Sequence, residues 1–405
     1  MTHRQTLHFL ACGHVDDGKS TLMGRLLYDI GVIPTDQVEG ARVDGAVDFS
    51  RLTDGLEEER AQGITIDVAY RYFRYQGRHY RITDTPGHVQ YTRNMAVAAA
   101  NSDCALVLVD AAHGVREQTV RHSCIAGFFG IRDFVVAVNK MDLADYAEVR
   151  FREIEAQYRA VFNAEPQGVR LTFIPVSGLR GDNVLTRSAA MPWYKGPSLM
   201  EYLAALEVEP PSVLGARLPI QSVIRIGDTR GYQGMLVDGA MKTGDQIGIA
   251  GSDATIRITA LYHGGREVDE ARPGQAVTLV TDAHADLSRG NVLYSLSAPV
   301  LCSDAFAARF LWLDPSYERQ ESVTGIIKIH HREEQAEVRV RRSDGLMLDA
   351  AIYTAASVPV DLYARHRRTG LFLMIDPETE HAIGAGTVTA LTDEAPVAQR
   401  HAAMF

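Results

Sequence analysis

The sequence contains little cysteine and no long apolar run. Its 405 residues include four cysteines with no Cys-x-x-Cys spacing among them, namely Cys12, Cys104, Cys124 and Cys302. A disulfide framework and a cysteine-based zinc site are therefore not indicated, and we expect buried free thiols of a reducing compartment. The chain has neither a charged-then-apolar leader nor an apolar stretch approaching membrane length, which predicts a cytoplasmic protein without a membrane span.

An excess of positive charge is also absent. The 41 Lys and Arg residues are outnumbered by 51 Asp and Glu residues, so the net charge is −10. Because RNA-bound proteins need clustered cations to neutralise phosphates, no nucleic-acid partner is expected. Two short basic runs, Arg339–Arg342 and Arg365–Arg368, are interpreted as solvated faces. His330 and His331 are adjacent, and neighbours on a strand point to opposite faces, which argues against a shared metal ion.

The order of apolar segments predicts the fold class. Up to about Val208, apolar strand candidates such as Ala105–Asp110 alternate with amphipathic segments such as Ala147–Phe162, the pattern of a doubly wound, mostly parallel α/β sheet. After the proline-marked linker Glu209–Leu214, short alternating strands with glycine turns predict antiparallel barrels. We therefore predict an α/β domain over residues 1–208, followed by all-β barrel domains over residues 213–298 and 299–395.

The most informative stretch is Gly13–Thr21, which reads GHVDDGKST. It follows the apolar strand candidate Leu7–Cys12 and precedes Leu22–Ile30, which has apolar residues at helical spacing. In this setting the glycines let backbone N–H groups and the helix N-terminus point at phosphates. Lys19 supplies positive charge to the terminal phosphates, and the Ser20 hydroxyl can coordinate Mg²⁺. The segment predicts a nucleoside triphosphate site.

The base is predicted from a second loop, Asn139–Asp142, which follows an apolar strand candidate. The Asp142 carboxylate can accept hydrogen bonds from the ring N–H and the exocyclic amine of guanine, a pair of donors that adenine lacks. Asn139 is expected to hold the base edge and the loop, and the stem of Lys140 to lie along the base plane. A third loop, which contains Ser177, completes the predicted guanine pocket.

Two further segments are placed to sense the terminal phosphate. In Gly63–Phe73, Thr65 can offer its hydroxyl and carbonyl to Mg²⁺ and the phosphate. In the second segment, Asp84 is expected as an outer carboxylate of the Mg²⁺ site, Gly87 as a backbone donor to the phosphate, and His88 as the group that orients the attacking water. Because these contacts exist only while the phosphate is present, hydrolysis is expected to release both segments.

Together these motifs resemble the translation-factor class of GTPases, the class of elongation factor Tu, over the first half of the chain. Longer stretches are similar to the GTPase (large) subunit of bacterial sulfate adenylyltransferase, at Asp54–Phe73, Asp84–Ala96, Glu117–Ser123, Asn139–Tyr146 and Met191–Leu203. The resemblance implies an α/β P-loop GTPase domain followed by two all-β barrel domains. It also implies that GTP hydrolysis is coupled to the formation of adenylyl sulfate and pyrophosphate from ATP and sulfate on a separate catalytic subunit.

The resemblance also implies a set of site residues, with GTP or GDP and Mg²⁺ as cofactors. The implied catalytic residues are His88, Lys19 and Thr65, and the implied Mg²⁺ ligands are Ser20, Thr65 and Asp84. The implied nucleotide contacts are Gly13, His14, Val15, Asp16, Asp17, Gly18, Lys19, Ser20, Thr21, Asp84, Gly87, Asn139, Lys140, Asp142, Ser177, Gly178 and Leu179.

Three departures from the family pattern concern the surface for a partner. The stretch Pro34–Arg60 and the last domain, from about Pro299, are shorter than usual, and Val89 stands where Glu is more frequent. The implied partner is the adenylyl-transferring small subunit, the catalytic ATP sulfurylase. A related adenylyl-transferring enzyme of a specialised pathway and a role as a translation factor are the alternatives. Since the chain has one phosphate loop and no His-x-x-His motif, another chain is expected to supply the adenylyl transfer.

Overall fold

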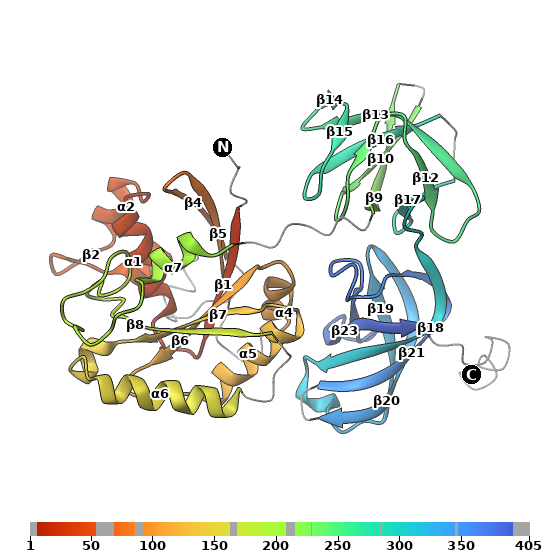
Figure 1. Ribbon diagram of the computed structural model, residues 1–405. Coiled ribbons are helices and arrows are strands. Elements are labelled where there is room, and N and C mark those ends of the chain that lie inside the picture. Colours follow the sequence, from red (N-terminus) through yellow and green to blue (C-terminus); the bar gives the residue numbers. More distant parts are fainter. Residues whose placement is uncertain are drawn as a thin grey trace. The chain divides into compact units, whose positions relative to one another are not determined.

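The structure, a computed structural model, describes residues 6–53, 69–85, 92–162, 168–207, 215–227, 229–282, 286–344 and 347–391. The chain divides into two compact units, Met1–Val208 and Glu209–Phe405. In Figure 1 the first unit, coloured red to green, contains helices and strands, and the second, green to blue, is built from strands. The predicted linker Glu209–Leu214 lies outside the described residues.

The first unit is organised around a six-stranded sheet in the order β4-β5-β1-β6-β7-β8. Five of these strands run parallel, and the edge strand β4 pairs antiparallel with β5. The strands are β1 (Leu7–Gly13), β4 (Ala69–Tyr75), β5 (Arg78–Asp84), β6 (Cys104–Asp110), β7 (Asp133–Asn139) and β8 (Arg170–Pro175), and a separate ribbon consists of β2 (Arg42–Val43) and β3 (Ala46–Val47). Every residue of β6 and β7 is buried, as expected for central parallel strands that are covered on both faces.

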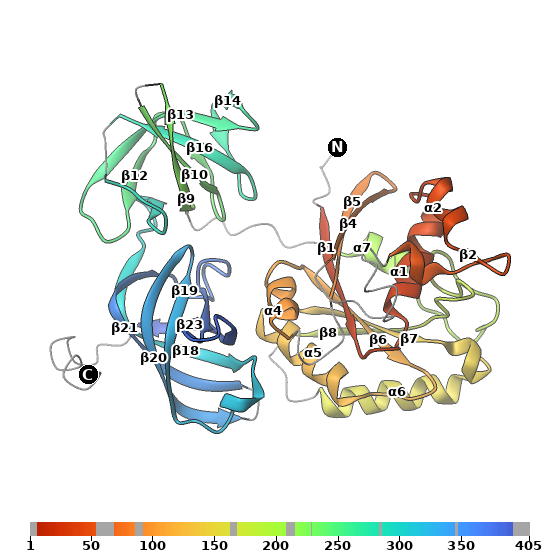
Figure 2. The ribbon, with the colours of Figure 1, turned by 180° about the vertical axis from the view of Figure 1, so that it is seen from behind.

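Helices lie on both faces of this sheet (Figures 1 and 2). They are α1 (Lys19–Ile30), α2 (Thr35–Gly40), α4 (Thr92–Ala100), α5 (Glu117–Phe128), α6 (Glu148–Val161) and α7 (Leu199–Ala205), with short 3-10 turns η1 (Phe49–Leu52) and η3 (Met141–Ala144). Helices α1 and α7 share one apolar core with the sheet, in which Leu26 and Leu203 are fully buried. The arrangement confirms the predicted doubly wound α/β fold.

The second unit contains two antiparallel barrels, as predicted. In the first, β12, β17, β9, β10, β16 and β13 form a sheet that is closed by pairing of β12 with β13, and β14 extends it. Its strands are β9 (Arg217–Ile226), β10 (Thr229–Met235), β12 (Gln246–Ile249), β13 (Thr255–His263), β14 (Arg266–Val268), β16 (Ala276–Thr281) and β17 (Val292–Ser295), and a ribbon consists of β11 (Met241–Lys242) and β15 (Glu270–Ala271). Because the sheet closes on itself, the backbone groups of its first and last barrel strands are hydrogen-bonded and few strand edges remain unpaired.

The second barrel is closed in the order β18-β21-β20-β19-β22-β23. Its elements are β18 (Leu301–Trp312), η4 (Pro315–Tyr317), β19 (Ser322–Ile329), β20 (Arg332–Asp344), β21 (Met347–Val360), β22 (Leu371–Ile375) and β23 (Ala382–Leu391). Exposed and buried residues alternate along most of β19, which is the signature of a strand with one face in a core. Phe310 and Trp312 meet edge to face inside the barrel, with ring centroids 4.9 Å apart.

Two of our sequence interpretations are wrong in this unit. His330 and His331 do not lie on a strand, because they form the tight turn between β19 and β20, where His330 has a φ of 55°. The run Arg365–Arg368 is not entirely a solvated face, since His366 is buried and its Nδ1 lies 2.9 Å from the Asp238 carboxylate. A partner 128 residues away in the sequence leaves no trace in a local charge pattern.

The cysteines and the lengths of the helices bear on two further expectations from the sequence. The four cysteines are free, two of them buried and two half-buried. In the described ranges, no helix is both long enough and apolar enough to cross a membrane.

Candidate functional site

Those predicted nucleotide residues that the structure describes come together at one edge of the sheet in the first unit. The parallel register sets Ala11 beside Asp84 and Asp110 beside Asn139, and Ser177 lies two residues after β8 ends. These positions lie at or close to the carboxyl ends of β1, β5, β6, β7 and β8. Open α/β sheets bind ligands at that edge, so the fold brings the separate motifs into one site.

The phosphate loop between β1 and α1 needs its two glycines. Gly13 and Gly18 have φ values of 150° and 88°, a region that other residues rarely adopt. A Cβ atom at Gly13 would lie 2.8 Å from the Leu108 carbonyl oxygen, and one at Gly18 would lie 2.6 Å from Asn139 Nδ2. Asp16 also has a positive φ, 70°. The loop therefore turns tightly against β6 and the base loop, with the N-terminus of α1 directly behind it.

Hydrogen bonds inside the loop fix its shape. The His14 N–H donates to Asp17 Oδ2 over 2.8 Å, and Lys19 Nζ donates to the His14 carbonyl over 3.2 Å. Asp17 is 2% exposed, and this burial raises its pKa to about 6, although the His14 N–H and the Lys19 charge act in the opposite direction. Lys19 is therefore held at the loop, close to where phosphates bind in such loops.

The remaining loop residues occupy the start of helix α1. Ser20 and Thr21 lie in its first turn and are half-buried, as is Val15 in the loop itself. The Thr53 hydroxyl donates to the Ser20 carbonyl over 3.2 Å. Thr53, the last described residue before 54–68, therefore lies beside Ser20.

Asn139 joins the phosphate loop to the third loop. Its Nδ2 donates to the Asp17 carbonyl over 2.8 Å, and its Oδ1 accepts from the Gly178 N–H over 2.9 Å. The side chain is buried, and both of its partners are backbone groups of the two loops. The two nucleotide loops are therefore held in one fixed relation.

Lys140 lies between two acceptors at the same edge. Its Nζ donates to the Asp16 carbonyl over 2.6 Å and lies 2.9 Å from Asp110 Oδ2. Burial acts to raise the pKa of Asp110, but hydrogen bonds from Lys140, the Ala112 N–H and His113 outweigh it and lower that pKa. Asp110 is a site residue that our sequence reasoning missed, and its position at the end of a buried parallel strand was the available signal.

The proposed base contacts also meet. Ser177 Oγ donates to Asp142 Oδ1 over 2.7 Å and accepts from the Arg180 N–H over 3.0 Å. The Arg180 N–H holds the Ser177 hydroxyl in place, and that hydroxyl in turn orients the Asp142 carboxylate through its Oδ1 atom. The other carboxylate oxygen, Oδ2, does not take part in this bond. Gly178 is held by Asn139, and Leu179 is exposed at the rim.

The switch residues are described only in part. Asp84 is buried at the end of β5, and the Thr85 hydroxyl donates to the Ala11 carbonyl over 2.9 Å. Thr65, Gly87 and His88 lie outside the described residues. Carboxylate and hydroxyl oxygens are ligands that suit Mg²⁺, so the donor set of Ser20 and Asp84 fits the predicted ion.

Our sequence reasoning missed Arg116, which contacts the phosphate loop from the N-terminus of α5, and His122, which is buried inside that helix. Arg116 Nη1 lies 2.7 Å from His14 Nδ1. His122 is fully buried, with its Nε2 2.7 Å from Gln118 Nε2. Burial lowers the pKa of His122 to about 3, helped by the nearby Lys19 and Arg121 charges, so its ring is neutral. Nothing in the sequence around His122 distinguishes a buried histidine of a helix from an exposed one.

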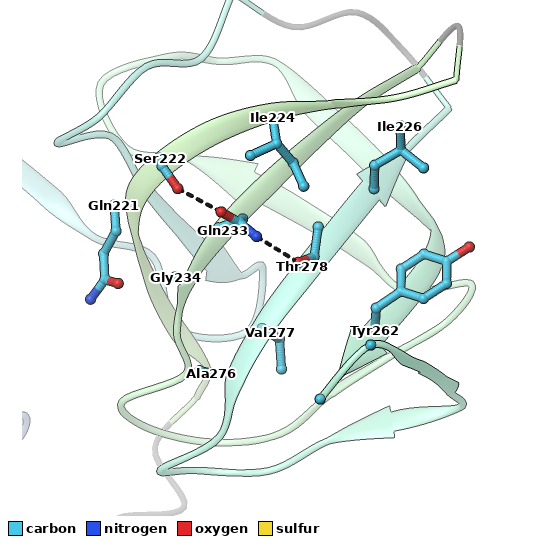
Figure 3. Close-up of a pocket in the computed structure, with 12 residues that line it drawn as sticks. Gln221, Ser222, Ile224, Ile226, Gln233, Gly234, Tyr262, Ala276, Val277 and Thr278 are labelled. Atoms are coloured by element: carbon cyan, nitrogen blue, oxygen red, sulfur yellow. Dashed lines mark hydrogen bonds between the residues drawn. The ribbon is translucent and has the colours of Figure 1, made fainter.

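A cavity of about 610 Å³ lies on the first barrel of the second unit. Figure 3 shows a hydrogen-bonded row across it, in which Ser222 donates to Gln233 and Gln233 donates to Thr278. Isoleucines, Val277 and Tyr262 form much of the remaining wall, and none of the lining residues is charged. The cavity therefore lacks the cations that a triphosphate requires, in contrast to the loop around Lys19.

The described parts of the two units hold no cluster of three or more His, Cys, Asp or Glu residues that could bind a metal ion.

Comparisons with known proteins identify the family of this chain. Residues 4–209 match the family described as "Elongation factor Tu GTP binding domain". Sulfate adenylyltransferase subunit 1 of Aliivibrio salmonicida (strain LFI1238) is 40% identical over 425 residues, covering 98% of this chain and 89% of that protein. The protein of the same name from Rhizobium meliloti (strain 1021) is 40% identical over 410 residues, covering 95% of this chain and 82% of that protein.

A solved structure supports the architecture. The crystal structure of translation elongation factor SelB from Methanococcus maripaludis matches with a TM-score of 0.54 and 18% identity, and the match covers 97% of this chain and 80% of that one. At this identity the likeness concerns the fold alone. From its GTP-binding domain and its full-length relatives, the chain belongs to the sulfate adenylyltransferase subunit 1 family, within the GTPases that share the elongation factor Tu GTP-binding domain.

Proposed function

We propose that this chain hydrolyses GTP and couples that hydrolysis to the synthesis of adenylyl sulfate on a separate catalytic subunit. The observation that carries the proposal is the 40% identity, over nearly the whole chain, to proteins named sulfate adenylyltransferase subunit 1. The junction at Asn139 adds to it, because a phosphate loop and a base loop held together suit a complete nucleoside triphosphate.

Guanine is recognised through Asp142 in this proposal. The Ser177 hydroxyl fixes one carboxylate oxygen, so the carboxylate is oriented before the base arrives. Its acceptors then face the ring N–H and the exocyclic amine, and an adenine would leave the carboxylate facing an acceptor nitrogen. The Lys140 stem covers a face of the base, since its ammonium is held between Asp16 and Asp110.

Phosphate binding falls to the loop and to helix α1. Backbone N–H groups from Gly13 to Thr21 bind the phosphate oxygens, and Lys19 exchanges its bond to the His14 carbonyl for a bond to phosphate. Ser20 and Thr65 would hold Mg²⁺, with Asp84 behind them, and the bound ion neutralises charge on the terminal phosphates. His88 positions the attacking water, so its contribution falls on hydrolysis rather than on binding.

The coupling has a thermodynamic motive. Adenylyl sulfate contains a phosphoric-sulfuric anhydride, whose formation from ATP and sulfate is strongly uphill. If the partner's progress along that reaction depends on the state of the segments around Thr65 and His88, GTP hydrolysis can drive it. The partner can change those segments only as far as it binds their two states differently. Both equations balance separately, since GTP and water give GDP and phosphate while ATP and sulfate give adenylyl sulfate and pyrophosphate.

An omission experiment tests this proposal. GTP hydrolysis and adenylyl sulfate formation are followed together in mixtures of this chain, the adenylyl-transferring subunit from the same organism, ATP and sulfate, with each component left out in turn. We expect slow GTP turnover by the chain alone and faster turnover in the complete mixture. Adenylyl sulfate made by this chain alone, or stimulation by ribosomes instead of the partner, would contradict the proposal and favour a translation factor in the latter case.

A further inference from the structure

The edge of the sheet in the first unit carries a hairpin that is unusually rich in outward-facing aromatic and basic residues. Strands β4 and β5 are joined by the turn Gln76–Gly77, whose two residues have φ values of 46° and 80°, as in the tight turns that suit two-stranded ribbons. In the part of the chain that the structure describes, β4 pairs only with β5. One side of the hairpin is therefore a strand edge that another chain can reach.

The two faces of β4 differ sharply. Phe73 points into the core and stacks on Tyr80 with ring centroids 4.8 Å apart. On the opposite face, Tyr70 is 46% exposed and Tyr72 is 72% exposed. Tyrosines that leave this much surface in water contribute little to the stability of the core, whereas Tyr is enriched at protein interfaces and among their energetic hot spots.

The charge of the hairpin is equally one-sided. Between Ala69 and Thr83 the sequence has four arginines and a histidine but no Asp or Glu, in a chain whose net charge is −10. The register pairs Tyr72 with Arg81 and Arg74 with His79 across the outward face. The Arg81 guanidinium lies 5.5 Å from the centre of the Tyr70 ring. We define the hairpin face by these side chains: Tyr70, Tyr72, Arg74, His79 and Arg81.

The other arginines of the hairpin have structural partners. Arg78 is buried and donates to the Leu206 carbonyl over 2.6 Å, just beyond α7, and Arg71 donates to the Thr53 carbonyl. Arg81, which belongs to the hairpin face, also donates to the carbonyl of Asn101. By contrast, among the residues with described positions no carboxylate forms an ion pair with Arg74 or Arg81. The positive charge of the hairpin face is therefore available to an acidic partner.

The position of the hairpin links it to the nucleotide. Residues 54–68, which contain Thr65, run directly into β4, and Asp84 at the end of β5 is followed within four residues by His88. A protein bound to the hairpin face would therefore contact two strands that continue in the sequence into the segments proposed to sense the terminal phosphate.

We propose that the hairpin face is the docking surface for the adenylyl-transferring subunit, which presents to it a segment rich in Asp and Glu. This inference rests on the proposed function. A nucleic acid is the less suitable occupant, because tight RNA binding needs several phosphate contacts and the face offers only Arg74, Arg81 and His79 in an acidic chain. An acidic protein segment needs fewer cations and uses the two tyrosines as apolar anchors.

The test measures binding of the adenylyl-transferring subunit to the full chain with GTP and Mg²⁺ present. Tyr72→Ala and Arg74→Glu are expected to raise the Kd by about 30-fold or more, which is the scale of a hot-spot residue, and Arg74→Glu also to weaken the dependence of the association rate on salt. Tyr72→Phe keeps the ring and is expected to bind nearly as well as the wild type. Val149→Ala on α6 and Arg319→Glu in the second unit are matched controls, since both residues are exposed.

Basal GTP turnover and GTP affinity verify that the variants are folded, because neither Tyr72 nor Arg74 belongs to the nucleotide site. If the wild type is stimulated by the partner and both hairpin variants bind it within threefold of the wild type, the docking surface is wrong while the proposed function stands. If the wild type itself shows neither binding nor stimulation, the proposed function fails and the docking surface with it. Tighter binding of poly(U) RNA than of the partner, weakened by the same substitutions, also overturns the inference.

Discussion

The junction at Asn139 makes a prediction that the structure allows us to quantify. In the Asn139→Ala variant, the Asp17 carbonyl and the Gly178 N–H lose their partners. A buried backbone group without a hydrogen bond costs about 1–3 kcal/mol, and water that enters the space left by the amide recovers part of this cost. The total cost is then about 2–4 kcal/mol. If this cost arises when GTP binding orders the two loops, the Kd for GTP rises by about 30- to 1,000-fold.

Because the free chain can avoid the cost by letting the loops separate, we expect the Kd for GTP to rise by at least about 30-fold and the free energy of unfolding to change little. Titration calorimetry with GTP and Mg²⁺ measures the Kd, and urea denaturation measures the stability.

Asn183 provides the matched control for this prediction. It is also a buried asparagine, and its amide donates to the Pro175 carbonyl over 2.9 Å and accepts from the Ser188 N–H over 2.7 Å. It does not connect the two nucleotide loops. Asn183→Ala is therefore expected to lower the stability, all the more because Asn183 has a φ of 55°, and to leave the Kd for GTP within threefold. An unchanged Kd in Asn139→Ala, or an equal loss of affinity in Asn183→Ala, would refute the reasoning.

Three further predictions concern the same unit. Asp142→Asn should shift the preference from GTP toward xanthosine triphosphate in competition binding, because the new amide can donate to the oxygen that replaces the guanine amine, and unchanged selectivity would remove Asp142 from the site. His88→Ala should keep GTP affinity while lowering hydrolysis about 10²-fold or more, whereas Lys19→Ala should impair both, as separate binding and single-turnover measurements would reveal. Since the pKa of His122 is about 3 in the folded chain and about 6.5 when unfolded, the unfolded state gains a proton first and stability falls as the pH drops below 6.5, by about 2 kcal/mol at pH 5. In the His122→Gln variant, followed by Trp193 fluorescence in a Trp312→Phe background, that loss should be absent. Equal acid sensitivity of both proteins would contradict it, and the comparison cancels the opposite contribution of Asp17.

Local sequence signals predicted the elements of the nucleotide site well. The strand before the phosphate loop, the helix after it and the strands before Asn139 and Ser177 all exist, because apolar periodicity and glycine positions are properties of a few consecutive residues. The helix α1 begins at Lys19, three residues before the apolar spacing indicated, since Gly18 in the left-handed region allows the chain to turn directly into it.

Contacts between distant parts of the chain were not predictable in the same way. Asp110 holds Lys140 because parallel register places two strand ends side by side, which requires the strand order. In the second unit, Arg217 donates to both carboxylate oxygens of Asp361, over 2.9 Å and 3.0 Å, and Thr369 donates to the same carboxylate over 2.7 Å. Arg217 comes from the first barrel and Asp361 follows the β21 strand of the second. A buried ion pair of this kind joins residues 144 positions apart, and no local pattern marks either residue.

The measurement that tests the central claim most directly is the final ratio of adenylyl sulfate to ATP in the presence of this chain, its adenylyl-transferring partner, sulfate, pyrophosphate and an excess of GTP. The comparison replaces GTP by a non-hydrolysable analogue at the same concentration. Coupling predicts that the ratio with GTP rises above the ratio reached with the analogue and falls back once the GTP is consumed. The same ratio with both nucleotides, accompanied by continuing GTP hydrolysis, would show that the chain hydrolyses GTP without driving sulfate activation.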